Sequence, residues 1–177
     1  MFEARARSPA ARLAGVELRC LIEIPKGSRN KYEYDERLGG IKLDRFLFSS
    51  VVFPADYGFF PGTLGEDGDG LDAMVLVGQP TFPGCVIEVR PIAVLRMADD
   101  RGADDKIICV PCQDPHWSGL EKLDDISPQL RTEIEHFFSI YKQPEGIEVE
   151  VHGFEDRGTA LEVIERARER FSTRARG

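Results

Sequence analysis

Apolar and polar residues alternate along much of the first three quarters of the chain, with the period of two that half-buried β-strands show. The clearest stretch is "GVELRCLIEIP" at 15–25. Clusters of Gly, Pro and Asp separate it from five further stretches of strand character: "IKLDRFLF" (41–48), "DAMVLVG" (72–78), "CVIEVRPIAVLRM" (85–97), "DKIICVP" (105–111) and "EVEVHGF" (148–154). Short strands punctuated in this way predict a mainly β protein, either a barrel or a sandwich.

The period changes to that of an α-helix near 128–142. Ser127 is placed to cap this helix, and Pro128 suits its first position. Apolar residues recur there at three- and four-residue spacing: Leu130, Ile134, Phe137, Phe138 and Tyr141. A second helix, apolar on one side and charged on the other, is predicted near 157–171. We expect both helices to pack one face against the strands.

The composition is that of a globular chain with one core. The chain has 177 residues, of which 42% are hydrophobic and 31% charged. We expect a single domain at 15–171, with a flexible N-terminal tail at 1–14 and a C-terminal tail at 172–177. The N-terminal tail lacks the apolar region of a secretory signal, and an organellar targeting segment is the less favoured interpretation of its arginines. No apolar run approaches the roughly 20 residues that span a bilayer, so we expect no membrane association.

Charge is distributed unevenly along the chain. The net charge is −8; residues 1–14 carry +2 and residues 166–177 carry +4, which leaves −14 on the stretch between them. An acidic body of this kind repels nucleic acid and attracts metal cations.

Four cysteines are present, and Cys109 and Cys112 form a C-x-x-C sequence, "CVPC". A redox or zinc motif is one interpretation. No second C-x-x-C follows, and the pair ends an apolar run instead of opening a helix, where a thiol pKa is lowered. We therefore expect structural cysteines with free thiols and a cytoplasmic location, because the cytoplasm keeps thiols reduced.

Two acidic clusters follow or precede strands: "EDGDGLD" at 66–72 and "ADDRGADDK" at 98–106. A calcium-binding EF-hand loop counted from Asp67 is excluded, because its fifth, sixth and twelfth positions would be Leu71, Asp72 and Gly78. Solvated acidic turns explain the glycines. A metal site also explains why there are two clusters.

If the clusters converge, their carboxylates repel one another by about 4 kcal/mol per close pair at an effective dielectric near 20. Hard cations such as Mg²⁺ remove this repulsion and leave positions open for water and phosphate. A phosphate site also requires fixed positive charge, for which the candidates are Lys31, Arg45, Lys106 and Lys142.

Five stretches in order resemble soluble family I inorganic pyrophosphatases of the short bacterial type: "EIPKGSRNKYEYD", "LDRFLFSSVVFPADYGFFPGTL", "DGDGLDAMVL", "RPIAVLRMADDRGADDKIICVP" and "HFFSIYK". The resemblance implies an OB-like five-stranded β-barrel with two C-terminal helices packed outside. It also implies Mg²⁺-dependent hydrolysis of pyrophosphate to two orthophosphates, with several Mg²⁺ ions per site that Mn²⁺ or Zn²⁺ can replace. A homohexamer is implied as well.

The same resemblance assigns site residues position by position. The metal ligands are Asp67, Asp72, Asp99, Asp104 and, through water, Glu23. Asp69 matches the carboxylate that orients or deprotonates the attacking water, with Asp99 as the alternative base. The phosphate contacts are Lys31, Arg45, Tyr57, Lys106, Tyr141 and Lys142. Glu33 matches an acid that lies behind these side chains and does not itself contact the phosphate.

One position departs from the family pattern. Gly70 stands where the family usually has proline, which fixes φ near −65°. We therefore expect a more flexible loop in the absence of ligands, and we expect Gly70→Pro to be neutral or helpful.

Two other classes of function remain alternatives at this stage. One is a single-stranded nucleic-acid-binding OB module, which the acidic body disfavours. The other is a homologue with impaired catalysis that acts by interaction, for which Gly70 is the only indication.

Overall fold

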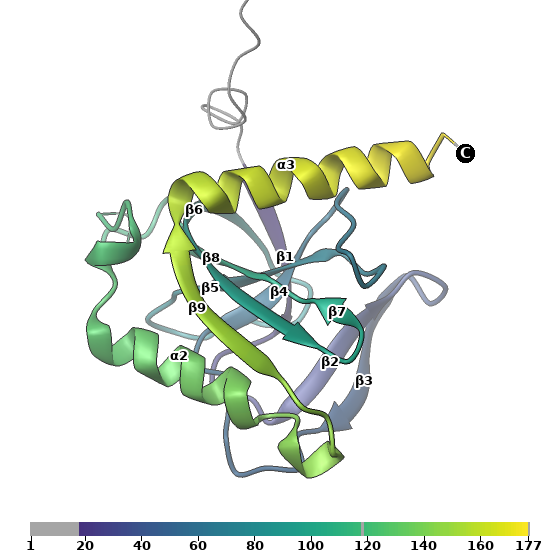
Figure 1. Cartoon of the computed structure of the whole chain (residues 1–177), viewed down its shortest axis with the longest axis horizontal. Helices are drawn as coiled ribbons and strands as arrows, with labels where there is room; N and C mark the ends of the chain where they lie inside the picture. Colours follow the sequence, from purple (N-terminus) through teal and green to yellow (C-terminus); the bar gives the residue numbers. More distant parts are fainter. Residues whose placement is uncertain (1–17, 118, 177) are drawn as a thin grey trace, which may run out of the picture.

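The computed structural model of the chain describes residues 18–117 and 119–176, so the predicted N-terminal tail lies outside the described residues. Within that part the chain forms nine strands and two α-helices (Figure 1). The strands are β1 (Leu18–Ile24), β2 (Asn30–Asp35), β3 (Gly40–Phe46), β4 (Asp56–Phe60), β5 (Leu71–Val75), β6 (Val86–Asp99), β7 (Gly102–Ala103), β8 (Lys106–Pro111) and β9 (Glu150–Asp156). The helices are α2 (Pro128–Ile140) and α3 (Arg157–Arg174), and single 3₁₀ turns occur at Leu123–Asp125 and Gln143–Glu145.

Five strands close into a barrel in the order β1-β4-β5-β8-β6, and β6 returns to pair with β1. The β5–β8 pair is parallel, and the other pairs in this ring are antiparallel. β7 and β9 extend the sheet by pairing with β6, while β2 and β3 form a separate hairpin. The prediction of a five-stranded barrel is confirmed, and the sandwich alternative is wrong.

Alternate residues of β5 face two different apolar clusters. Leu71, Ala73 and Val75 pack in the cluster that includes the buried side of α3. Met74 instead belongs to the cluster that contains the aromatic residues of α2. Asp72 shares the parity of Met74, because side chains alternate along a strand. The sheet therefore directs Asp72 toward the side on which α2 ends.

The two helices begin where the sequence predicts. The Ser127 hydroxyl accepts a hydrogen bond from Leu130 N at 3.2 Å, and Pro128 is the first helical residue. The Asp156 carboxylate caps α3 by accepting from Thr159 N at 3.0 Å. α3 lies across one side of the barrel and α2 against another (Figure 1). α3 continues to Arg174, past the expected end near residue 171.

The hairpin strand β2 and the barrel strand β4 were not among the predicted strands. β4 carries no alternation, because four of its five residues are buried. Its Gly58 permits close contact with β1: a Cβ there would lie 1.9 Å from the carbonyl oxygen of Leu21. β4 can therefore approach β1 only with glycine at this position.

The C-x-x-C sequence contributes no disulfide. Cys109 is buried in β8 and Cys112 is exposed just beyond it, and neither forms a disulfide. Burial raises the pKa of the Cys109 thiol, which makes it unreactive. The interpretation as structural cysteine agrees with the burial of Cys109 and stays a prediction for Cys112. No helix in the described residues is long and apolar enough to cross a membrane.

Candidate active site

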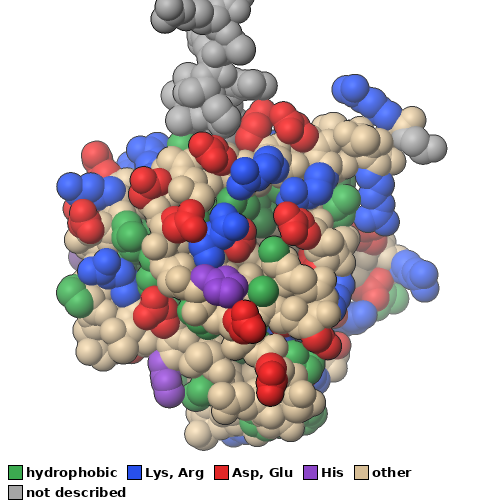
Figure 2. Space-filling model, viewed as in Figure 1, with side chains coloured by type: hydrophobic (Ala, Val, Ile, Leu, Met, Phe, Trp, Pro, Cys, Tyr) green, Lys and Arg blue, Asp and Glu red, His purple; other side chains and the backbone are tan. Residues whose placement is uncertain are grey.

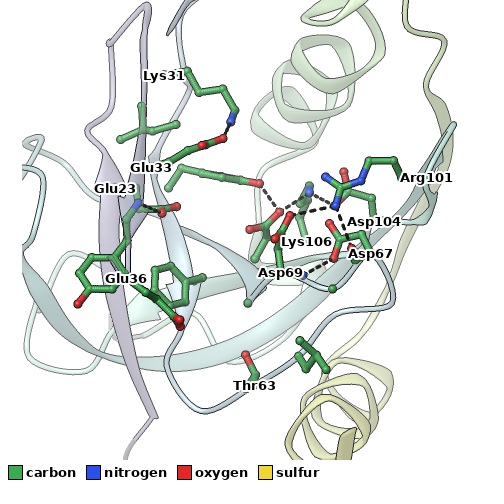
Figure 3. A pocket seen from close by; sticks show the side chains of 18 of the residues that line it. Glu23, Lys31, Glu33, Glu36, Thr63, Asp67, Asp69, Arg101, Asp104 and Lys106 are labelled. Atoms are coloured by element: carbon green, nitrogen blue, oxygen red, sulfur yellow. Dashed lines mark hydrogen bonds and ion pairs between the residues drawn. The ribbon is translucent and has the colours of Figure 1, made fainter. Parts of the chain in front are cut away.

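Both acidic clusters open into one cavity of about 770 Å³ (Figure 3). The barrel, the β2–β3 hairpin and the C-terminal part of α3 contribute to its walls. Twelve of the thirteen predicted site residues line it: Glu23, Lys31, Glu33, Tyr57, Asp67, Asp69, Asp72, Asp99, Asp104, Lys106, Tyr141 and Lys142. Residues up to 119 positions apart are thus brought together, as the convergence argument predicts.

Lys106 lies at the centre of the buried end of the cavity. Its ammonium contacts Asp104 and lies 2.5 Å from Asp72 Oδ2, to which Tyr57 also donates at 2.5 Å. The side chain is 1% exposed. Burial alone would lower the pKa of Lys106, but the carboxylates of Asp72 and Asp104 outweigh it and raise the pKa. Lys106 therefore stays protonated.

The two carboxylates share this one buried ammonium, so negative charge is in excess around it. Burial raises the pKa of Asp104 to about 6, although Lys106 opposes the shift. Burial likewise raises the pKa of the Tyr57 hydroxyl, with Asp72 adding to it. Tyr57 is consequently a hydrogen-bond donor at neutral pH.

The loop between β4 and β5 carries Asp67 and Asp69. Gly68 between them has φ +94°, a conformation that glycine adopts at low cost. Asp69 N donates to Asp67 Oδ1 at 3.1 Å, and Gly65 N donates to the Asp69 carbonyl at 2.7 Å. These bonds give the loop one defined turn, from which both carboxylates line the cavity.

Glu23 reaches the cavity from β1 and is fixed by the hairpin. Its Oε1 accepts a hydrogen bond from Tyr34 N at 2.7 Å. Burial raises the pKa of Glu23 to about 7, although the bond from Tyr34 opposes the shift. Nearby, Lys31 forms ion pairs with Glu33 and, at 3.5 Å, with Asp44. The hairpin therefore supplies a lysine to the rim of the cavity.

Arg45 is the one predicted site residue that does not line the cavity. It pairs with Lys31 across the β2–β3 hairpin. Its guanidinium forms ion pairs with Asp44 at 2.5 Å and with Glu145 at 2.8 Å. Its role as a phosphate contact stays a prediction.

Comparison with known proteins connects this geometry to a family. The inorganic pyrophosphatase family matches residues 20–172. The inorganic pyrophosphatase of Methanosarcina mazei is 56% identical over 152 residues, which cover 86% of this chain and 90% of that protein. The Streptomyces coelicolor enzyme of the same name is 51% identical over 157 residues, covering 88% and 96%.

The chain belongs to the inorganic pyrophosphatase family.

Solved structures agree on the fold. The Thermus thermophilus inorganic pyrophosphatase has a TM-score of 0.85 at 43% identity and covers 89% of this chain and 93% of its own. The Helicobacter pylori inorganic pyrophosphatase has a TM-score of 0.85 at 39% identity, covering 88% and 94%. Inorganic pyrophosphatases have an OB-like fold and are metal-dependent hydrolases that convert pyrophosphate to phosphate. The OB-like prediction is confirmed.

The donor set of the cavity suits the metal dependence of this family. Among the described residues, no three His, Cys, Asp or Glu side chains form a group that could hold a metal ion. Lysines and Arg101 form ion pairs with the carboxylates of the cavity. Eight acidic and five basic side chains line the cavity, a surplus of three negative charges. Carboxylate oxygens are the ligands that Mg²⁺ prefers. The cavity fits divalent cations.

Among the residues of the pyrophosphatase cavity that were not identified from the sequence, three contact or adjoin the acidic loop or the start of β5. Arg101 bridges the two acidic clusters by donating to Asp67 O at 2.9 Å and Asp69 Oδ2 at 3.3 Å. The buried Thr63 hydroxyl accepts from Leu71 N at 2.9 Å at the start of β5. Phe59 lines the wall beside the acidic loop. The sequence offered an indication for Arg101, because this residue stands between two pairs of aspartates. It offered none for Thr63 or Phe59.

Proposed function

We propose that this chain hydrolyses inorganic pyrophosphate to two orthophosphates with Mg²⁺ as its cofactor. The observation that carries the proposal is the convergence of both acidic clusters with Lys31, Lys106 and Lys142 in one cavity. Carboxylates alone would suit a cation-binding protein, and lysines alone would suit an anion-binding one. The combination suits a substrate that is a polyanion handled with divalent cations.

Five carboxylates would hold the cations. Asp67 and Asp72 come from the first acidic cluster and Asp99 and Asp104 from the second, while Glu23 acts through water. Mg²⁺ held by these residues would neutralise phosphate oxygens and lower the pKa of a coordinated water toward neutrality.

The cationic and hydroxyl side chains would bind the phosphate groups. Lys31, Lys106 and Lys142 act as point charges for the electrophilic and leaving phosphates, and Arg45 can offer its planar fork. Tyr57 and Tyr141 donate O–H groups, since burial raises the pKa of both. Glu33 holds Lys31 in place through its ion pair. Attack in line with the leaving group spreads charge over the equatorial oxygens, where these groups stabilise it.

Asp69 would accept the proton of the attacking water. Its side chain is 69% exposed and touches Arg101 at 3.3 Å, so an oxygen remains free for water. Asp99, the alternative base, is 5% exposed and bound by Lys142. The contrast in accessibility favours Asp69.

Further properties belong to the same proposal. Mn²⁺ and Zn²⁺ are expected to replace Mg²⁺, because both accept carboxylate oxygen ligands. We place the protein in the cytoplasm, since none of the cysteines at 20, 85, 109 and 112 forms a disulfide. We also propose a homohexamer; exposed apolar side chains are available for contacts between copies, among them Phe46, Phe48 and Phe82.

The nucleic-acid alternative is not favoured. Lys and Arg side chains are interspersed with Asp and Glu over the face drawn in Figure 2. Single-stranded nucleic acid instead requires a positively charged groove with stacked aromatic residues.

Phosphate release decides the proposal. The purified full chain is incubated with pyrophosphate, ATP or a phosphomonoester, each with Mg²⁺ and with a chelator. We expect phosphate release from pyrophosphate only when Mg²⁺ is present, and little phosphate release from ATP or the phosphomonoester. Phosphate release that persists in the chelator would contradict the proposed Mg²⁺ dependence. No phosphate release from pyrophosphate would contradict the proposed activity.

A further inference from the structure

The acidic loop between β4 and β5 is closed at its base by two hydrogen bonds. The hydroxyl of Thr63, labelled in Figure 3, accepts from Leu71 N at 2.9 Å, and Gly65 N donates to the Asp69 carbonyl at 2.7 Å. The Thr63 hydroxyl also donates to the Phe60 carbonyl at the end of β4. Thr63 and Gly65 therefore bond across the base of the loop, whereas the residue between them bonds outside it.

That residue is Leu64, and both of its backbone polar groups bond to α3. Leu64 N donates to the Ala167 carbonyl at 2.9 Å, and the Leu64 carbonyl accepts from Arg170 Nε at 2.8 Å. A hydrogen bond from a guanidinium is stronger than one between neutral groups, because its donor carries charge. The helix therefore fixes the two peptide groups on either side of the Leu64 Cα atom.

α3 is itself firmly packed at the level of this contact. Ala160, Ile164 and Ala167 are fully buried in the apolar cluster that also contains Phe60 and Leu71, the residues at the two ends of the loop. The face of the helix that meets the loop is thus continuous with the core of the barrel.

The acidic loop also borders a second cavity, of about 350 Å³. Glu66 and Asp67 of the loop line this cavity together with Val163, Arg166 and Arg170 of α3. Asp67 lines the active-site cavity as well, so the loop forms a wall between two open spaces. A segment with open space on both sides is stabilised less by packing, so the hydrogen bonds at its base matter more for its order.

We propose that Arg170 is a positioning residue of the cation site, because through Leu64 it fixes the base of the loop that presents Asp67 and Asp69. Gly65, which follows Leu64, bonds to the Asp69 carbonyl, and a Cβ built on Gly65 would lie 2.8 Å from Asp67 Oδ1. A shift of Leu64 is therefore passed to both acids. A loop that is ordered before a cation binds loses less conformational entropy on binding. The proposal rests on the proposed function in that Asp67 is a cation ligand.

Arg170→Met keeps the stem of the side chain and removes the donor, so it tests this role directly. In metal-free protein, we expect the amides of Leu64 and Gly65 to exchange about tenfold faster than in the parent chain, as for the loss of one hydrogen bond. The amide of Ile164, in the buried part of α3, should keep its parental rate. Calorimetric Mg²⁺ binding without substrate should weaken about tenfold, the lower end of the range for residues that support metal ligands.

Arg168→Met is the matched control, because Arg168 lies on the same helix and is not among the residues that line either cavity. We expect no change in this control. Arg170→Lys keeps a charged donor and should recover part of both losses. If Arg170 acts through the loop, adding Arg170→Met to Asp67→Asn should weaken Mg²⁺ binding by only about twofold, because the ligand that the loop presents is already impaired.

Parental exchange of the Leu64 and Gly65 amides in Arg170→Met would overturn the proposal. Faster exchange at Ile164 as well would show a general loss of stability and would overturn it too, as would an undiminished loss of Mg²⁺ affinity in the Asp67→Asn background. Hydrogen exchange and Mg²⁺ binding require no pyrophosphate. Absence of hydrolysis in the parent chain would therefore contradict the proposed function and leave the role of Arg170 standing.

Discussion

The ammonium of Lys142 lies 2.6 Å from Oδ2 of Asp99, although 43 positions separate the two residues. The contact joins the segment after α2 to the end of β6. Burial alone would raise the pKa of Asp99, but Lys142 and the backbone N–H of Arg101 outweigh it and lower the pKa. A carboxylate held ionised in this way is a weak proton acceptor, which argues against Asp99 as the base.

Asp69→Asn is expected to lower kcat by about 10²- to 10⁴-fold, the range for loss of one acid–base group. Mg²⁺ binding should change little, since Asp69 is not among the proposed ligands. Steady-state kinetics and calorimetry separate the two effects, and Asp100→Asn is the exposed control in the neighbouring cluster. Full kcat in Asp69→Asn would transfer the role of base to Asp99.

Asp67→Ala is expected to raise the Mg²⁺ concentration for half-maximal activity at least tenfold, because even outer partners of metal ligands contribute about 10- to 100-fold in affinity. The carboxylate also accepts the backbone N–H of Asp69 at 3.1 Å. Asp67→Asn keeps that acceptor and removes the charge, so it isolates the loss of a ligand from a disturbance of the turn. An unchanged Mg²⁺ titration in both variants would rule out Asp67 as a ligand.

The sequence predicted six of the nine strands in the described residues, β1, β3, β5, β6, β8 and β9, and with them the place of the site. Asp72 and Lys106 stand at the starts of β5 and β8, which pair in parallel, so their meeting follows from the topology. Contacts that depend on the shape of a loop were not predictable. Arg101 reaches Asp69 across 32 positions, and this contact depends on how the loop before β5 and the turn after β6 fold.

Lys106→Met is expected to lower the free energy of unfolding of the metal-free protein by about 3–5 kcal/mol, the cost of leaving a buried charge without its partner. Methionine keeps much of the volume, so the loss is mainly electrostatic: Asp72 and Asp104 remain together with no ammonium between them. Urea unfolding with and without Mg²⁺ measures the effect. Added Mg²⁺ should recover part of the stability, because a cation bound only by the folded state stabilises it.

Lys31, at the edge of the cavity, provides the control for Lys106→Met. Lys31→Met removes an ammonium whose side chain is 19% exposed, whereas that of Lys106 is 1% exposed. The loss should be smaller, within about 1 kcal/mol, as for partly solvated ion pairs. Equal losses in the two variants would contradict the electrostatic account of the buried end.

Asp56 is a buried carboxylate outside the active-site cavity, so its substitution should change stability without changing catalysis. It is fully buried at the start of β4, and its two oxygens accept from Lys26 N at 2.8 Å, from Thr81 N at 3.0 Å and from the Thr81 hydroxyl at 2.5 Å. Asp56→Asn replaces one oxygen with an NH₂ group, so a backbone N–H loses its acceptor. We expect the free energy of unfolding to fall by about 1–3 kcal/mol, as for an unsatisfied buried group.

None of these three bonds reaches the cavity, so kcat well below the melting temperature should stay near that of the parent chain. Urea unfolding and kinetics on the same preparation check both halves of this prediction. Thr81→Val is the matched variant: it removes the hydroxyl alone and should cost less than Asp56→Asn. A large loss of kcat in a folded Asp56→Asn protein would show that this carboxylate also orients the neighbouring Tyr57, whose hydroxyl lies 2.5 Å from Asp72.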